Sequence, residues 1–541
     1  MANFNPAFTL FNCTILLRLV VPITASGFKA VSVVLLLKRG KVYIAGAGPG
    51  DPELLTLKVI NHIRTAEVIV YDHLINQEVL RYATPSAELI YAGKMSGEHI
   101  KSQDEINAIL VDKARAGYNV LRLKGGDPFL FGRGGEEAVA LADESIDFEI
   151  IPGVSSINAV PLYAGIPLTH RDLSSSVVII TGHKHTAAGI DEHNWDAIAK
   201  IDTIVILMGV AQIKQIAQKL VSKGRDPQDH VGIIRWGTMP MQSTHVCTLQ
   251  DILEERHKPF MTPALIIVGK VVTLHDKLCW FEKLPLFGKK VLITRMEKDS
   301  SILRQSLEWL GAFVIEQPSI QITAPDDYSP LDSALHKLGS YDIIIFTSAN
   351  AVRRFLDRLW ASGRDVRSIG NAKIVAIGPK TAQAIEDLKI RVNQVPDEFR
   401  AEGLIALLNG EVSGKKILIP RAQTARMVLV EELKRMGAVV DVVPVYKTIR
   451  AEVRQDMLPY LKDGVDIAVF TSSSTVTNFF DMFGGNAFPM LEHADIACIG
   501  PITAKTVHDM GLEVRIQPAS YTIEALIQEM ILYYKNGRRQ V

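Results

Sequence analysis

The sequence predicts an α/β fold made of several open, largely parallel sheets. A chain of 541 residues is too long for one hydrophobic core, so we expect three or more domains. Within residues 41–269, short apolar runs alternate with amphipathic segments and glycine-rich turns, which is the pattern of βαβ units. The remainder of the chain contains an internal duplication of the same alternation.

Composition limits the kind of partner. Lys and Arg together number 59, and so do Asp and Glu, so no net field favours nucleic acid. The four cysteines lie far apart, without the spacing of a metal or redox site. We therefore expect a cytoplasmic protein, in a reducing compartment, that uses no metal and binds no nucleic acid.

The first forty residues differ from the rest, because no acidic residue occurs before Asp51. Their apolar runs, residues 14–23 and 31–37, are shorter than the roughly 18 apolar residues that a membrane helix needs, so we expect no membrane contact. We expect residues 1–40 to be a disordered extension, or to precede the real start, and to carry no chemistry. A weak signal or transit peptide is the alternative.

The first glycine-rich turn joins two expected strands. Residues 41–45 predict a strand, 46–52 the turn, 54–65 a helix and 67–72 a second strand. This order suggests a dinucleotide site with Asp72 on a ribose, but the fingerprint fails because Asp51 replaces its third glycine. An acid there would repel a pyrophosphate. We therefore expect a neutral or cationic ligand, with an NAD-dependent oxidoreductase as the alternative.

A second turn, residues 124–137, contains several glycines, Asp127 and two phenylalanines directly after a strand expected at 119–123. Glycine lets a backbone approach a flat ligand closely and adopt positive φ. Asp127 can accept hydrogen bonds from hydroxyls or amines, and Phe129 and Phe131 supply apolar walls. We expect a binding loop, although an ordinary surface loop can have the same composition.

The alternation continues through the rest of this half. We expect a helix at 103–116 and further strands at 88–92, 148–151, 176–181, 203–208, 231–234 and 264–268. Glycines follow the last three strands, at Gly209, Gly237 and Gly269. Glycine-rich strand ends on one edge of an open α/β sheet predict a binding crevice there.

Six motifs in this half resemble the tetrapyrrole methylase family: residues 46–51, 71–74, 124–137, 151–154, 165–171 and 263–269. The resemblance covers residues 41–281 and is strongest to the uroporphyrinogen-III C-methyltransferases. It implies a two-lobed α/β methylase that transfers methyl groups from S-adenosyl-L-methionine to C2 and C7 of uroporphyrinogen III, giving precorrin-2. It also implies a homodimer.

The same resemblance implies roles for individual residues. Asp72 would be the base and Lys94 the proton donor, with the N-cap of a helix after the strand as the alternative for Asp72. Arg171 would bind substrate carboxylates, and Lys94, Arg122 and Arg133 are further candidates; surface ion pairs are the alternative. The donor would touch nine residues: Pro49, Gly125, Gly126, Asp127, Leu130, Ser155, Ser156, Met208 and Gly237.

After a linker at 282–288, the sequence of residues 289–535 is duplicated. Segment 289–295 recurs as 415–421, 341–348 as 465–472, and 373–379 as 495–501. We expect two similar lobes with parallel sheets and a cleft between them.

Each repeat contains a Phe-Thr-Ser turn before an expected helix, with Thr347 and Ser348 in the first repeat and Thr471 and Ser472 in the second. Helix starts expose N–H groups and the positive end of the dipole, which suits the carboxylates of a substrate. Simple helix capping explains each turn equally well.

The duplicated half resembles the uroporphyrinogen-III synthase family through residues 346–350, 443–448 and 470–476. The resemblance implies a two-lobed parallel α/β synthase that cyclises hydroxymethylbilane to uroporphyrinogen III, with loss of water and without a metal or cofactor. Tyr446 would be the acid that helps the hydroxyl leave; a core tyrosine is the alternative. Together the two halves imply a bifunctional enzyme of tetrapyrrole biosynthesis. A methylase fused to a non-catalytic carboxylate sensor is the alternative.

Overall fold

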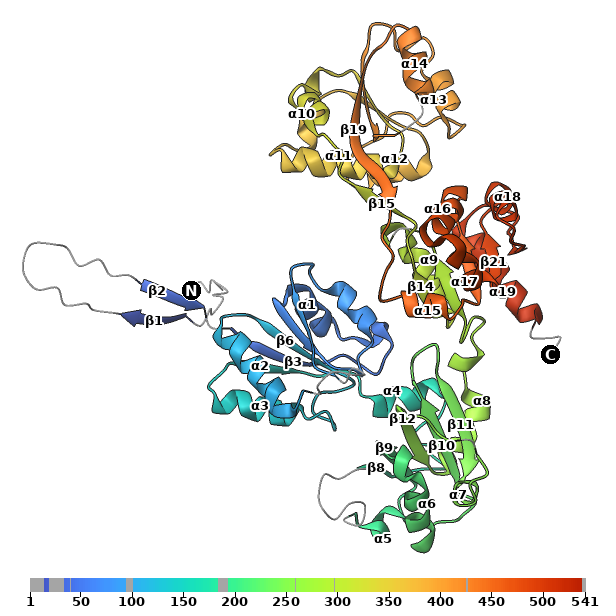
Figure 1. Cartoon of the computed structure of the whole chain (residues 1–541). Coiled ribbons are helices and arrows are strands. Elements are labelled where there is room, and N and C mark those ends of the chain that lie inside the picture. The colour runs from blue at the N-terminus through green and yellow to red at the C-terminus, as the bar shows by residue number, and fades with distance from the viewer. Residues whose placement is uncertain are drawn as a thin grey trace, which may run out of the picture. The chain divides into compact units, whose positions relative to one another are not determined.

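A computed structural model describes residues 14–18, 34–38, 40–93, 101–182, 193–257, 259–295, 297–424 and 427–537. The chain forms two compact units, whose elements are labelled in Figure 1. The first unit comprises Met1–Lys289 with Trp309–Phe313, and the second comprises Lys290–Glu308 with Val314–Val541.

The first sheet of the first unit is entirely parallel, with the strand order β5-β4-β6-β3-β7. Its strands are β3 (Val42–Gly46), β4 (Val68–Tyr71), β5 (Glu88–Tyr91), β6 (Val120–Lys124) and β7 (Phe148–Ile151). All five fall within a residue or so of the predicted ranges. Because the strands are parallel, their C-terminal ends share one edge of the sheet.

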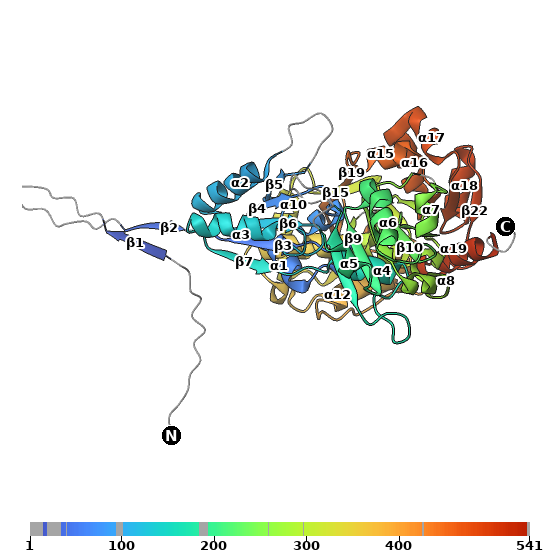
Figure 2. The ribbon, with the colours of Figure 1, turned by 90° about the horizontal axis from the view of Figure 1, so that it is seen from below.

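Helices cover both faces of this sheet, as Figure 2 shows. α2 (Gln103–Arg115) and α3 (Gly134–Asp143) pack on the face that contains Val120, whereas α1 (Leu57–Thr65) packs on the face that contains its neighbour Leu121. Adjacent residues of a strand point to opposite faces, so an apolar run such as β6 is buried on both sides.

The helix predicted at residues 54–65 is divided in two. Its two parts are a short 3₁₀ turn, η1 (Pro52–Leu54), and α1. The division has a local cause: the Thr56 hydroxyl accepts a hydrogen bond from Val59 N at 3.3 Å and so caps α1. A separate 3₁₀ helix, η2 (Gln77–Tyr82), follows β4.

The second sheet is mixed, with the order β11-β10-β12-β9-β8. Only β8 and β9 pair in parallel; the other pairs are antiparallel. The strands are β8 (Val177–Thr181), β9 (Thr203–Leu207), β10 (His230–Arg235), β11 (Ser243–Thr248) and β12 (Ala264–Val268). The sequence did not predict β11, an edge strand whose polar residues give no apolar run.

Short helices surround the second sheet. α4 and η5 pack on one face, and α5, α6 and α7 pack on the other. In chain order they are α4 (Ser156–Tyr163), α5 (Trp195–Ile198), η4 (Val210–Gln212), α6 (Ile213–Ser222), α7 (Leu249–Leu253), η5 (Lys270–Leu274), α8 (His275–Leu278) and η6 (Phe281–Lys283).

The expectation that Gly209, Gly237 and Gly269 share one edge was wrong for Gly269. β12 runs antiparallel to β9, so its C-terminal end lies beside the start of β9. A Cβ placed on Gly269 would lie 2.5 Å from the carbonyl oxygen of Asp202, which precedes β9. The sequence pattern showed where strands end but not their direction.

Within residues 1–40, which we expected to form a disordered extension, the structure describes two strands. β1 (Thr14–Arg18) and β2 (Val34–Lys38) pair antiparallel in a two-stranded sheet of their own. The other residues before Gly40 lie outside the described ranges.

The second unit contains two five-stranded sheets. The first has the order β14-β13-β20-β21-β22 and consists of β13 (Lys290–Ile293), β14 (Phe313–Glu316), β20 (Ile467–Phe470), β21 (Asp495–Cys498) and β22 (Val514–Ile516). The second has the order β15-β19-β18-β16-β17 and consists of β15 (Ile320–Thr323), β16 (Ile343–Phe346), β17 (Lys373–Ala376), β18 (Lys416–Ala422) and β19 (Val439–Arg450). In the second sheet β15 pairs antiparallel with β19, and the other pairs are parallel.

The two sequence repeats do not each form one lobe, contrary to the expectation. Each sheet combines the first two strands of one repeat with three later strands of the other. Thus β13, from the first repeat, pairs with β20 from the second. Conversely, β18 from the second repeat pairs with β16 from the first. The duplication is real, and the chain exchanges strands between the lobes.

Helices flank both sheets of the second unit. α10, α11 and α12 pack on one face of the β16 sheet, and α13 and α14 pack on the other. The helices are α9 (Glu297–Trp309), α10 (Ser329–His336), η7 (Leu338–Ser340), α11 (Ala349–Ala361), η8 (Val366–Ile369), α12 (Pro379–Glu386), α13 (Ala401–Leu407), α14 (Val428–Arg435), α15 (Leu458–Lys462), α16 (Ser473–Phe483), η9 (Gly484–Asn486), α17 (Ala487–Leu491), α18 (Pro501–Asp509) and α19 (Ile523–Gly537). None of the described helices has the length and apolarity that a membrane crossing requires.

Candidate active sites

The glycine turns that follow β3 and β6 are joined to each other. Gly48 N donates to Gly126 O at 3.3 Å and Gly126 N donates to Gly48 O at 2.7 Å, which forms an isolated antiparallel bridge. A Cβ placed on Gly46 would lie 2.4 Å from Gly126 O and 2.6 Å from Gly153 Cα. Three strand ends therefore converge so closely that their backbones leave no room for side chains.

Asp127 holds two of these turns in place. Its Oδ1 accepts a hydrogen bond from Phe129 N at 2.9 Å, and its Oδ2 accepts one from Gly153 N at 3.2 Å. Asp127 was predicted to contact the donor directly. The structure shows that each carboxylate oxygen already accepts one backbone N–H, so the residue also fixes the shape of the loop.

The start of α4 lies against Gly126. Ser155 caps this helix by accepting a hydrogen bond from Ile157 N at 3.3 Å. Gly126 has a positive φ of 67°, and a Cβ placed on it would lie 3.6 Å from Ser156 N and 3.9 Å from Ser155 Cα. Three residues predicted to hold the donor are therefore neighbours in the structure.

A turn of the second sheet reaches the first glycine turn. Thr238 Oγ1 accepts a hydrogen bond from Asp51 N at 3.0 Å, and a Cβ placed on Gly50 would lie 2.9 Å from the Met239 side chain. Gly237 itself packs on α4, where an added Cβ would lie 2.4 Å from the Val160 side chain. The segments that carry Pro49 and Gly237 are thereby brought together.

The sequence suggested that Asp51 presents a free carboxylate to a ligand at this turn, but in the structure the carboxylate is hydrogen-bonded within the protein. Its Oδ2 accepts a hydrogen bond from the Tyr163 hydroxyl at 2.7 Å, and its Oδ1 accepts one from Glu53 N at 2.8 Å. Burial raises the pKa of the Asp51 carboxyl, and the hydrogen bond from Tyr163 opposes this rise. Asp51 therefore ties the turn to α4.

Leu130 and Met208 belong to exposed segments. Leu130 is 40% exposed and stands between Phe129 and Phe131, which are 56% and 43% exposed. Met208 follows β9 with a positive φ of 53° and is 50% exposed. The two expected phenylalanine walls are thus accessible apolar surface.

Asp72 belongs to a charged network beneath these turns. Its Oδ1 accepts a hydrogen bond from Leu74 N at 3.2 Å. The expected alternative of a helix N-cap was wrong, because the next helix along the chain, η2, is capped by Asn76. The Oδ2 of Asp72 lies 3.5 Å from Arg122 Nη2, and 26% of the Asp72 side chain is exposed. The carboxylate is therefore oriented by a cation and remains accessible to a ligand.

Glu137 is the centre of this network. Its Oε1 lies 3.1 Å from Arg122 Nε and 2.7 Å from Lys124 Nζ, and Gln103 Nε2 donates to it at 3.2 Å. The Glu137 side chain is fully buried. Burial lowers the pKa of Lys124, and the positive charge of Arg122 lowers it further. The positive charges of Arg122 and Lys124 are balanced by the negative charges of Glu137 and Asp72.

Sequence reasoning did not find Glu137 or Gln103. The available signal was the pair of cations, Arg122 and Lys124, inside an otherwise apolar strand. Cations in a buried strand require a buried acid nearby. The acid at Glu137 follows on α3, which directly succeeds the loop.

The predicted substrate cations behave differently from one another. Arg122 is buried and paired, rather than free for a substrate carboxylate. Arg133 pairs with Glu136 at the surface at 2.6 Å. Arg171 lies in an exposed turn after α4, and Lys94 is outside the described residues.

In the second unit the structure joins two predicted residues. The hydroxyls of Ser348 and Tyr446 lie 3.3 Å apart. Ser348 also caps α11 by accepting a hydrogen bond from Ala351 N at 3.1 Å. Tyr446 is 9% exposed and packs in the core beside β16, so its ring is a core residue while its hydroxyl meets a polar turn.

The equivalent turn of the other lobe has the same construction. Ser472 caps α16 by accepting a hydrogen bond from Thr475 N at 3.4 Å. Thr347 and Thr471 are half-buried at the ends of β16 and β20. The capping interpretation is thus confirmed for both serines. Their role toward a substrate and the cleft between the lobes stay predictions.

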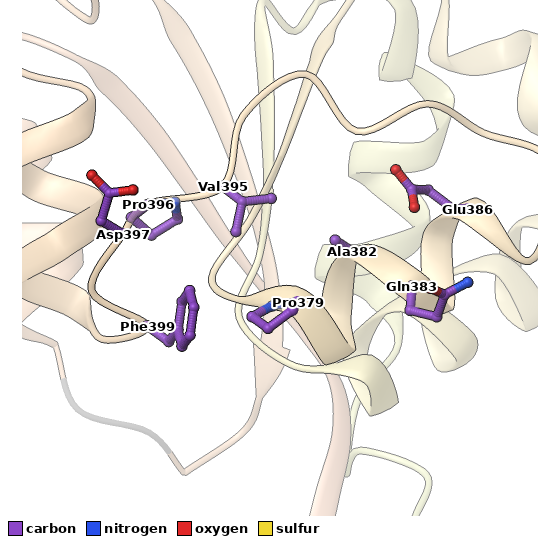
Figure 3. A pocket seen from close by; sticks show the side chains of 8 residues that line it. All are labelled: Pro379, Ala382, Gln383, Glu386, Val395, Pro396, Asp397 and Phe399. Carbon is purple, nitrogen blue, oxygen red and sulfur yellow. The ribbon is translucent and has the colours of Figure 1, made fainter.

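A shallow hollow of about 480 Å³ lies beside α12 (Figure 3). Its lining combines apolar residues, among them Phe399 and Pro379, with the acidic residues Glu386 and Asp397. Two carboxylates would repel a substrate that carries many carboxylates. This hollow is therefore a poor site for such a substrate.

These features define a class of protein: a two-lobed α/β enzyme with a glycine-lined site, followed by a duplicated α/β unit with hydroxyl-capped turns. Residues 41–253 match the family model of tetrapyrrole (corrin/porphyrin) methylases. Residues 301–528 match that of uroporphyrinogen-III synthase HemD. The chain belongs to both families, joined in one polypeptide.

Relatives support this assignment along nearly the whole chain. A "Porphyrin biosynthesis protein HemD" of Ruminiclostridium josui is 36% identical over 504 residues, which are 92% of this chain and 98% of that protein. A "Uroporphyrinogen-III C-methyltransferase" of Bacillus subtilis is 50% identical over 245 residues, 45% of this chain and 95% of that protein.

A solved structure is also similar. Uroporphyrin-III C-methyltransferase of Thermus thermophilus, complexed with S-adenosyl homocysteine, is 38% identical to this chain. The match covers 43% of this chain and 93% of that chain, with a TM-score of 0.38.

Proposed function

We propose that this chain is a bifunctional enzyme of tetrapyrrole biosynthesis. Its second unit cyclises hydroxymethylbilane to uroporphyrinogen III with loss of water. Its first unit then methylates uroporphyrinogen III at C2 and C7, giving precorrin-2. The observation that carries the proposal is the bridge between Gly48 and Gly126, which joins two glycine turns at the C-terminal edge of a parallel sheet.

The methyl donor of the first unit is S-adenosyl-L-methionine, whose sulfonium supplies an activated methyl group. The glycine turns fit such a ligand, because backbone groups without side chains can approach a flat, neutral or cationic molecule closely. We assign its binding to Pro49, Gly125, Gly126, Asp127, Leu130, Ser155, Ser156, Met208 and Gly237. An NAD-dependent oxidoreductase is disfavoured, because Asp51 replaces a fingerprint glycine and its carboxylate is bound to Tyr163.

Asp72 is the proposed base of the methylation. Attack by a substituted pyrrole carbon requires the ring to lose a proton elsewhere, and a positioned carboxylate assists this loss. The Leu74 N–H and Arg122 hold the Asp72 carboxylate in one orientation. Lys94 is the proposed proton donor, and the exposed Arg171 is assigned to the substrate carboxylates.

Tyr446 is the proposed acid of the cyclisation. A hydroxyl leaves hydroxymethylbilane more easily when a proton is delivered to it. The Ser348 hydroxyl, 3.3 Å away, orients the phenol. Thr347, Ser348, Thr471 and Ser472 stand at the starts of α11 and α16, and the N–H groups there suit substrate carboxylates.

We further propose the arrangement of the whole protein. The methylase spans residues 41–281, the linker 282–288 and the synthase 289–535, and the methylase half forms a homodimer. Cytoplasmic placement is supported by Cys247, Cys279 and Cys498, which are all free thiols. Fusion keeps the methylase close to the uroporphyrinogen III that the synthase produces.

One experiment tests both activities. Purified protein is given hydroxymethylbilane with and without S-adenosyl-L-methionine, and the products are separated by isomer and analysed by mass. We expect a type III ring without the donor and the same ring with two added methyl groups when the donor is present. A type I ring alone would show spontaneous closure and would support a non-catalytic carboxylate sensor in the second unit. A type III ring without added methyls would refute the methylase.

A further inference from the structure

Three potential metal ligands meet at the C-terminal end of the first unit, away from the glycine turns. His275 begins α8, Cys279 follows it, and Glu282 lies in η6. A ring nitrogen of His275, the Cys279 sulfur and a Glu282 carboxylate oxygen all lie within 4.8 Å of one another. The sequence spacing did not suggest this site, because only one of the ligands is a cysteine.

The histidine ring is held by a backbone carbonyl. His275 Nδ1 lies 2.6 Å from Ala164 O, and a carbonyl can only accept, so Nδ1 carries the proton. The neutral ring then has its lone pair on Nε2. Metal-binding histidines in proteins are commonly oriented by this kind of hydrogen bond.

The carboxylate of Glu282 is also oriented from behind. Its Oε1 accepts hydrogen bonds from Gln242 Nε2 at 2.9 Å and from Thr244 Oγ1 at 2.5 Å. Both donors act on the same oxygen, which directs the other oxygen, Oε2, to a different partner. Carboxylates that bind a metal are commonly held by hydrogen bonds of this kind.

Cys279 is buried, with 8% of the residue exposed. The Glu282 backbone N–H donates a hydrogen bond to its sulfur. Such an N–H donor stabilises a thiolate once a cation is bound to it. All three side chains are thus supported by neighbouring groups in the chain.

We infer that His275, Cys279 and Glu282 bind a zinc ion, with a water molecule as the fourth ligand. Zinc binds histidine nitrogen, cysteine sulfur and carboxylate oxygen, and it is usually tetrahedral. Sulfur and nitrogen ligands of one tetrahedral zinc ion stand about 3.5 Å apart. The three donors, which lie within 4.8 Å of one another, therefore approach by at most about 1.3 Å on binding, which side-chain rotation provides.

A zinc ion at this site would act on the first glycine turn only through the residues that lie between them. The ligands' supports come from α4, β11 and the segment after α8, so the ion would fasten three separate parts of the first unit. Trp280 and Phe281, between two of the ligands, pack their rings on Tyr163. Tyr163 in turn donates to Asp51 beside the first glycine turn.

The test uses the full chain, freed of metal with a chelator and then titrated with ZnCl₂ or CoCl₂ alone. We expect one zinc per chain by elemental analysis and a thermal midpoint of the first unit that rises by roughly 5 °C at saturation. The cobalt form should show a thiolate-to-metal charge-transfer band. Cys279→Ser and His275→Gln should lose the band and the thermal shift. The matched control Cys247→Ser, a half-buried thiol on β11 outside the cluster, should keep both.

Three results would overturn the inference. The first is the absence of stoichiometric zinc in the folded wild-type chain. The second is a cobalt spectrum without a thiolate band, which would place the metal on other ligands. The third is unchanged binding in both Cys279→Ser and His275→Gln. Circular dichroism of each metal-free variant distinguishes loss of binding from loss of folding, and the two substitutions remove different ligands, so a failure to fold in one leaves the other decisive.

Discussion

Tyr446 and Ser348 are 98 positions apart, yet their hydroxyls lie within 3.3 Å of each other. Tyr446 is on β19, which belongs to the second sequence repeat, and Ser348 caps α11, which belongs to the first. The contact exists because β16 and β19 are strands of one sheet. Exchange of strands between the repeats thus builds the proposed acid of the synthase.

Replacing Tyr446 by Phe is expected to slow cyclisation by about 100-fold, the usual effect of losing a general acid. The ring remains to fill the core, so the thermal midpoint should change little. Measurement of type III product formed per second, with the type I ring as the uncatalysed background, checks the prediction.

Tyr341→Phe is the matched control for Tyr446→Phe. Tyr341 is also a buried tyrosine of the same core, just before β16, but its hydroxyl donates to Asp441 at 2.6 Å rather than meeting a helix-start turn. It should retain full cyclisation activity. Equal losses in the two variants would mean that both act through packing alone.

Asp72→Asn is expected to leave donor binding nearly unchanged and to slow methylation by about 100-fold. Asparagine keeps an oxygen for Leu74 N but cannot take up a proton as a carboxylate does. Calorimetry with S-adenosyl homocysteine measures binding, and methyl transfer measures turnover. Loss of donor affinity in Asp72→Asn would contradict the assigned role.

Asp127→Ala is the contrasting variant and should weaken donor binding. The substitution removes the acceptor of the Phe129 and Gly153 N–H groups, whose hydrogen bonds shape the loop.

Gly46→Ala is expected to abolish measurable donor binding, because its methyl group would lie 2.4 Å from Gly126 O and would force the joined turns apart. Gly135→Ala provides the control. Gly135 lies in α3 and a Cβ there meets nothing within 4 Å, so alanine should slightly stabilise the helix. Calorimetric titration of both variants with S-adenosyl homocysteine decides the matter; normal affinity in Gly46→Ala would show that the turns do not form the donor site.

Glu137→Gln is expected to destabilise the first unit by about 3–5 kcal/mol, because Arg122 and Lys124 would keep their buried charges without their shared partner. Glu136→Gln is the adjacent control, since Glu136 pairs with Arg133 at the surface, and it should cost less than about 1 kcal/mol. Urea unfolding of the full chain, followed through the transition of the first unit, measures both. Similar midpoints for the two variants would refute the central role of Glu137.

Glu149 is expected to give the first unit part of its resistance to acid. Lys41 at 2.7 Å and Lys58 both bind its carboxylate, and their hydrogen bonds lower its pKa from 4.5 to about 2. A lowered carboxyl pKa stabilises the fold fully above the unfolded value of 4.5, and the contribution disappears as pH falls towards 2. The difference in urea midpoint between wild type and Glu149→Gln should therefore be larger at pH 7 than at pH 3. A difference that does not vary with pH would contradict the ion pairs.

The sequence was sufficient to predict most strands of the first unit, because parallel strands buried on both faces read as uninterrupted apolar runs. Residues 148–151 and 264–268 matched their strands without error. β11 escaped because it is an exposed edge strand of mixed composition. Gly269 was misplaced because strand direction depends on pairing between distant segments, which no local pattern records.

The sequence named candidate residues but not their contacts. The family resemblances pointed to Asp72 and Tyr446, a helix-start turn pointed to Ser348, and composition pointed to the two glycine turns. The position of Glu137 beneath Asp72 depends on how α3 packs on β6, and that is a tertiary fact. The exchange of strands between repeats was likewise invisible, since each repeat looks complete on its own.

The exchange has a consequence for synthesis of the protein. All strands of the β16 sheet lie between Ile320 and Arg450, so this lobe can close as soon as that stretch has left the ribosome. The other lobe begins earlier, at β13, yet it must wait for β20, and until then β13 offers an open edge to any passing strand. The first strand of the second unit to be synthesised, β13, is thus among the last to be covered. A chain that ended after Arg450 would contain one complete lobe together with β13 and β14, whose partner strands would be missing.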